Sequence, residues 1–104
     1  MTPKRLFKTL FQEVPTLETV STGGGCTGLF LLLDVDGSHL LVTHDASAPD
    51  ASNTEPQDLV TVGLYDRDGA QLNYTEVPAL HIAATLNIIQ AAYNMAGIKG
   101  FRKS

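Results

Sequence analysis

Two apolar segments of the chain each contain an Asp-Gly pair, and this pattern limits the fold more than any other feature. The segments LDVDGSHL (33–40) and YDRDGAQL (65–72) match at two aspartates, the glycine and a leucine. Asp-Gly pairs between apolar runs are typical of β-hairpin turns, because both residues accept a positive φ. We therefore predict hairpins with two-residue turns at 36–37 and 68–69, and hence an antiparallel sheet.

A helix is predicted on each side of this sheet in the sequence. Near the N-terminus, Thr2 suits an N-cap and Pro3 a first helical position, and apolar residues recur at helical spacing until Pro15. Near the C-terminus, the segment 77–98 contains no charged residue, and we predict a helix over 79–96. Its polar stripe consists of Asn87, Gln90 and Asn94, which favours a helix buried against the sheet over a membrane span.

These elements predict a single α+β domain of 104 residues, a length that can bury one hydrophobic core. The expected order is an N-terminal helix in 1–15, a four- to five-stranded antiparallel sheet in 16–77, a C-terminal helix in 78–98 packed on one face, and a basic tail in 99–104. The sheet region contains a long polar segment, ASAPDASNTEPQ (46–57), which has no apolar periodicity. We predict a surface loop there that is either functional or mobile.

Charge is distributed unevenly along the chain, although the formal net charge is only −4. Three basic residues lie in 1–12 and three in 99–104, whereas all eleven acidic residues lie between them with Arg67 as the one basic residue. The acidic middle predicts a protein partner of basic character. Direct binding of nucleic acid is not favoured, because the basic residues are divided between the two termini.

The segment STGGGCTGL (21–29) is interpreted as a conformational link between strands, since glycine adopts backbone angles that other residues avoid. Its exposed N–H groups could also form the rim of a binding site. Together with the polar loop and the acidic edge of the sheet, this rim is the predicted contact surface. The candidate binding residues are Gly23, Gly24, Gly25, Thr27, Asp50, Glu55 and Asp58.

The same segment has the spacing of a nucleophile elbow with Cys26 in place of serine. A catalytic thiol would need a base, for which His39 and His44 are the candidates. However, residues from Leu29 onward are predicted to be extended, so no helix N-terminus would activate the thiol. We therefore predict no enzymatic activity, and a thiol hydrolase or transferase using Cys26 remains the alternative.

No metal or cofactor is predicted. The cysteine and the histidines lack the paired short spacing of structural zinc sites, and the DxDG segments lack the glutamate that closes a calcium loop. A single cysteine and the absence of an apolar stretch of signal-peptide length near the N-terminus predict a cytoplasmic protein without membrane contact.

The segments VSTGGGCTGL, LLVTHDA and VTVGLYDRDG, followed by an alanine-rich helix, resemble small uncharacterised proteins of phages that infect actinobacteria. The resemblance covers residues 16 to about 95, and STGGGCT is its most specific part. It implies a phage accessory protein acting in the host cytoplasm, and it implies no activity, cofactor or catalytic residue.

The function predicted from the sequence is thus that of a small non-enzymatic binding protein, which modulates or inhibits a host or phage macromolecule. Besides the thiol enzyme, a second alternative is a homodimeric structural or assembly protein whose interface is the uncharged C-terminal helix.

Overall fold

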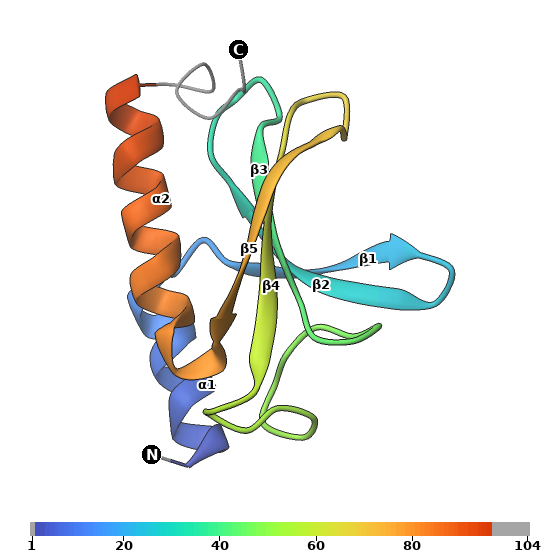
Figure 1. Cartoon of the computed structure of the whole chain (residues 1–104), viewed down its shortest axis with the longest axis vertical. Helices are drawn as coiled ribbons and strands as arrows, with labels where there is room; N and C mark the ends of the chain where they lie inside the picture. The colour runs from blue at the N-terminus through green and yellow to red at the C-terminus, as the bar shows by residue number, and fades with distance from the viewer. Residues whose placement is uncertain (1, 97–104) are drawn as a thin grey trace.

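The computed structural model describes residues 2–96 and shows the predicted α+β fold. Its elements are α1 (Pro3–Glu13), β1 (Glu18–Gly23), β2 (Cys26–Leu32), β3 (His39–Thr43), β4 (Leu59–Tyr65), β5 (Gln71–Pro78), a 3₁₀ turn η1 (Ala79–His81) and α2 (Ile82–Ala96). The strands form one antiparallel sheet in chain order, and both helices lie on the same side of it (Figure 1). The predicted helix end at 97–98 and the basic tail at 99–104 lie outside the described residues.

Helix α1 begins at the predicted position. The Thr2 hydroxyl accepts a hydrogen bond from the Arg5 backbone N–H (3.4 Å), and Pro3 occupies the first turn, where no N–H donor is needed. The helix ends at Glu13, before Pro15. Its apolar stripe is buried and consists of Leu6, Phe7 and Leu10.

The hydrophobic core lies between the helices and one face of the sheet. Leu31 of β2 pairs with Leu40 of β3, which pairs with Leu64 of β4. Because residues that pair across adjacent strands lie on the same face of a sheet, these three side chains share the core face. The strand members of the core are Leu29, Leu31, Leu40, Val42, Val60, Val62 and Leu64, and its helical members include Phe7, Leu10, Ile82 and Leu86. The alternate positions of the same strands face the other side, where most side chains are half-buried or exposed.

Both Asp-Gly pairs lie in hairpin turns, but the predicted two-residue turns are wrong. The Gly37 N–H donates to the Asp34 carbonyl in the β2–β3 turn, and the Gly69 N–H donates to the Asp66 carbonyl in the β4–β5 turn, both at 3.0 Å. Both glycines have a positive φ, whereas the aspartates before them do not. Each turn therefore spans four residues and ends in a glycine with a left-handed backbone conformation. Aspartate is a favoured first residue of such a turn.

Helix α2 follows η1 and runs alongside β5 on one side of the sheet (Figure 1). The Tyr93 hydroxyl donates to Asp34 Oδ2 (3.1 Å), which ties α2 to the β2–β3 turn. The exposed surface of α2 is wider than the predicted polar stripe, because Ile88 (68% exposed) and Met95 (90% exposed) also face solvent. Among the helices of residues 2–96, none is long and apolar enough to cross a membrane.

Candidate functional site

The consecutive glycines form the tip of the β1–β2 hairpin. Gly23 pairs with Cys26, so Gly24 and Gly25 are the two residues of the turn. All three glycines are exposed and have φ values of +96°, +59° and +80° in chain order. Figure 1 shows this hairpin projecting away from the helices. The glycines therefore supply backbone geometry for a tight turn, in agreement with the interpretation of the sequence.

Thr27 joins the base of this hairpin to the long loop between β3 and β4. Its backbone N–H donates to the Ala46 carbonyl (3.3 Å), and its hydroxyl accepts from the Ala48 N–H (2.8 Å). Thr27 also lines a groove of about 450 Å³ that Asp50 lines from the loop. The structure thus brings together two of the predicted contact residues, with the glycine tip farther along the same hairpin.

The loop spans 44–58 and uses its acidic side chains to stabilise its own turns. Asp50 Oδ1 accepts hydrogen bonds from the Ser52 hydroxyl (2.6 Å) and the Ser52 N–H (2.7 Å), and these bonds lower the pKa of Asp50 below its ordinary value. Asp58 Oδ2 accepts from the Glu55 N–H (3.0 Å). The carboxylates of Asp50 and Asp58 therefore have a structural role. Glu55 is exposed.

Each candidate base has partners other than the candidate thiol. His44 belongs to the loop, where its Nδ1 lies 3.3 Å from Thr54 Oγ1 and its Nε2 lies 3.7 Å from Asp58 Oδ2. His39 pairs with Leu32, six residues along β2 from Cys26, a separation of about 20 Å in an extended strand. Within residues 2–96, no hydrogen bond links Cys26 to a histidine.

Cys26 itself begins strand β2, so the extended conformation predicted for this region is confirmed. Among the described residues, no group of three or more His, Cys, Asp or Glu side chains is arranged to hold a metal ion.

We expect Cys26 to react with iodoacetamide at neutral pH no faster than a small-molecule thiol, because it lies in a strand and, among the described residues, has no hydrogen bond to a histidine. The measurement is the alkylation rate of the native protein, with the urea-unfolded chain as control. Alkylation about tenfold faster in the native protein than in the unfolded chain would instead support the thiol-enzyme alternative.

The feature that sequence reasoning missed is the open face, which we define as the outward side chains of the sheet on the side opposite the helices. Its members are Phe30, Leu32, His39, Leu41, Tyr65 and Tyr74, of which Leu32 (49%) and Tyr74 (62%) are the most exposed. Three of the rings form a stacked row across β2, β3 and β4. The ring centroids of Phe30 and His39 lie 4.8 Å apart, and those of His39 and Tyr65 lie 5.3 Å apart.

Two hydrogen bonds and one glycine fix this row in place. Since a carbonyl only accepts, His39 Nδ1 donates to the Gly37 carbonyl (2.8 Å), which fixes the imidazole ring. The Tyr65 hydroxyl accepts from Gln71 Nε2 (3.2 Å). A Cβ at Gly63 would lie 2.9 Å from the Tyr65 ring, so the absence of a side chain there lets the ring lie over the strand.

Carboxylates surround the open face. Glu18 pairs with Phe30, and Glu76 lies on the same face at the other edge of the sheet. The turns at one end of the face carry Asp36, Asp66 and Asp68 with the single basic residue Arg67, whereas Asp34 bonds to Tyr93 on the helix side. An apolar centre with a mainly acidic border favours partners that carry cationic side chains.

Comparison of the chain with protein-family models, with curated proteins and with solved structures finds no match.

Proposed function

We propose that this chain is a non-enzymatic protein-binding module, a phage accessory factor that modulates or inhibits a host or phage macromolecule. The observation that carries the proposal is the open face, where apolar and aromatic side chains remain in contact with water on a five-stranded sheet. Contiguous exposed apolar surface bordered by polar residues is typical of interaction sites. The phage context rests on the sequence resemblance.

The aromatic side chains of the open face are already ordered, so a partner could bind with a small loss of conformational entropy. Phe30, His39 and Tyr65 already stack on one another before a partner arrives. Aromatic side chains also have few rotatable bonds, so they contribute contact area while losing little rotamer freedom. The Phe30 and Tyr65 rings therefore suit the role of anchors at an interface.

The charges around the open face favour a protein partner over a nucleic acid. Exposed rings on a sheet can stack on bases, but such sheets need basic residues to hold the phosphates. Here Glu18, Glu76 and the turn aspartates would repel a phosphate backbone. Arginine or lysine side chains of a protein would instead find carboxylates and aromatic rings.

The test is affinity capture from an actinobacterial lysate with three forms of the protein, read by quantitative mass spectrometry. Leu32→Glu places a charge on the open face at a half-exposed position, and Ala84→Glu places the same charge on the exposed side of α2. We expect a protein whose recovery falls at least about tenfold with Leu32→Glu and is unchanged with Ala84→Glu. Equal recovery of every protein by all three forms would contradict the proposal.

The exposed Met95 and Ile88 on the uncharged surface of α2 support a second candidate, a homodimer with a structural or assembly role. Light scattering at about 10 μM distinguishes the two candidates, since a stable dimer of micromolar affinity or better would be evident at that concentration.

A further inference from the structure

Strand β5 is the last strand of the sheet, so within residues 2–96 one side of its backbone has no neighbouring strand. In an antiparallel ladder, the residues that bond to one neighbour alternate with residues that point away. The Ala79 N–H donates to the Asp58 carbonyl (2.8 Å), one step beyond the pair formed by Leu59 and Pro78. The odd-numbered residues of β5 therefore face β4, and the even-numbered residues face the free edge.

Two further observations agree with this assignment. The Tyr74 N–H donates to Asn73 Oδ1 (2.8 Å), a side chain of its own strand. Pro78, which has no N–H, occupies an even-numbered position, where no donor to β4 is required. The free edge thus presents the N–H and carbonyl groups of Tyr74 and Glu76.

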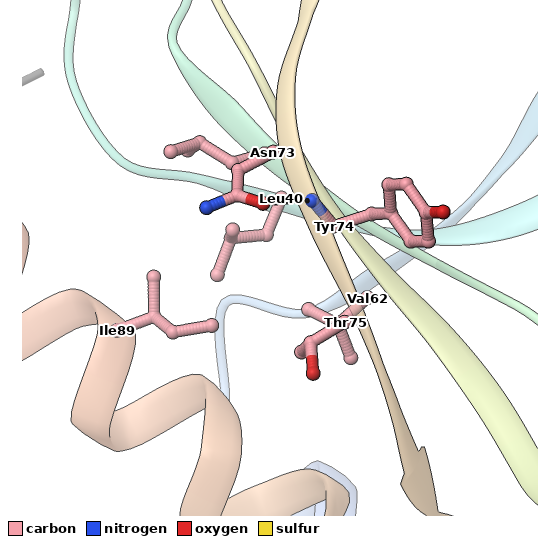
Figure 2. Close-up of a pocket in the computed structure, with 7 residues that line it drawn as sticks. Leu40, Val62, Asn73, Tyr74, Thr75 and Ile89 are labelled. Atoms are coloured by element: carbon pink, nitrogen blue, oxygen red, sulfur yellow. Dashed lines mark hydrogen bonds between the residues drawn. The ribbon is translucent and has the colours of Figure 1, made fainter. Parts of the chain in front are cut away.

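A pocket of about 150 Å³ opens beside this edge on the helix side of the sheet. Its floor is apolar and consists of Leu40, Val62 and Leu64, with Ile89 of α2 as the opposite wall. Figure 2 shows Ile89 projecting from α2 toward the strands, while the Tyr74 ring points away from the helix. Beside the pocket, the inward positions of β5 are the exposed polar residues Asn73 and Thr75, which leave the floor open to solvent, whereas Val77 farther along the strand packs against the core.

Helix α2 extends this apolar wall beyond the pocket. Ala83 lines the gap between α1 and α2, whereas Ile89 faces β5. At about 100° per residue, Ile88 lies farther round the helix on the β5 side. Its 68% exposure shows that this apolar side chain faces solvent.

We propose that β5 and α2 form a groove that binds an extended peptide of a partner protein as a sixth, antiparallel strand. The residue opposite Thr75 is aliphatic and enters the pocket, whose volume suits a group of about the size of benzene. The preceding residue lies opposite Glu76 on the other face and is cationic, because Glu76 is the one charged residue of β5 and has no ion pair among the described residues. This groove adjoins the open face at Tyr74 and Glu76, and it goes beyond the function proposed above.

A second copy of the chain fits this groove less well. Pairing β5 with a second β5 would place inward Asn73 or Thr75 residues next to the apolar floor, where polar side chains leave it unfilled. It would also bring two Glu76 carboxylates to one edge with no cation. A segment with an aliphatic side chain beside a basic one satisfies both positions.

The test uses the synthetic peptide acetyl-Ser-Arg-Val-Tyr-Val-Thr-Lys-amide, which places Arg opposite Glu76 and the first Val opposite Thr75. We expect saturable binding below about 1 mM, with shifts of the Tyr74 and Glu76 amide signals in NMR spectra. N-methylation of the peptide's Arg and Tyr, whose N–H groups face β5, should weaken binding at least about tenfold. N-methylation of its two Val residues, whose N–H groups face away, is the matched control and should change it much less.

Protein variants separate this groove from the open face. Thr75→Lys, at an exposed rim position, should weaken peptide binding at least about tenfold, and Leu32→Glu should leave it unchanged. Asn73→Ala should strengthen binding severalfold, because it removes the side chain that competes for the Tyr74 N–H. No binding at about 1 mM, or equal binding by the two N-methylated peptides, would overturn the proposal without bearing on the open face.

Discussion

Replacing Leu31 with alanine is expected to lower the free energy of unfolding by about 2–5 kcal/mol, whereas replacing Leu32 should lower it by about 1 kcal/mol or less. Leu31 is fully buried between its partner Leu40 and the helices, while its neighbour Leu32 is 49% exposed on the other face. The two variants remove the same atoms from adjacent positions of one strand. Any difference between them therefore reports which face of the sheet is covered.

The measurement is urea unfolding followed by circular dichroism, with the midpoint and slope fitted for each variant. A domain of this size has a stability of about 5–15 kcal/mol, so the Leu31 variant should remain folded but lose a large part of that margin. Equal losses at the two positions would mean that both faces of β2 are buried, which contradicts the register described here.

Replacing Gly23, Gly24 and Gly25 together with alanine is expected to destabilise the β1–β2 hairpin by roughly 3–6 kcal/mol. This value follows from about 1–2 kcal/mol for each L-residue forced to a left-handed backbone angle. A Cβ at any of these positions would meet no atom within 4 Å, so the effect is conformational rather than steric. Amide hydrogen exchange of residues 18–32 should then accelerate relative to that of β3 and β4.

Gly24→Asn is the matched control, because its φ of +59° is an angle that asparagine adopts readily. It should cost about 1 kcal/mol or less. If the triple variant unfolded with the same urea midpoint and the same hydrogen exchange as the native protein, the left-handed turn could not be the reason for the glycine run.

Much of the fold could be predicted because local signals and tertiary contacts agree. Thr2 and Pro3 locate the start of α1, and the glycines mark the tip of a hairpin. The Asp-Gly pairs located two hairpins, but the turn type was wrong. The decisive signal was the aspartate two residues before each pair, Asp34 or Asp66, which begins a four-residue turn.

The open face could not be predicted because β2 is apolar on both sides. Phe30 and Leu32 alternate with buried Leu29 and Leu31, so the run has no polar positions to mark its outer face. Only the strand order and the placement of both helices on one side reveal that one face is uncovered.

The sequence also did not show which candidate contact residues the fold would bring together. Thr27 meets the loop because of the β2–β3 register, which no local pattern encodes. The groove beside β5 did leave a sequence signal, namely Asn73 and Thr75 at inward positions of an otherwise apolar face. That signal becomes readable only when the inward face of β5 is known.

The central claim is that the open face is the binding surface, and NMR chemical-shift mapping with the captured partner tests it most directly. The prediction is that shifts of the ¹⁵N-labelled protein cluster at Leu32, Leu41 and Tyr65, while the amide of Ala84 on α2 is unaffected. Shifts confined to α2 or to the 44–58 loop, with none on the outward positions of β2, β3 and β4, would contradict it.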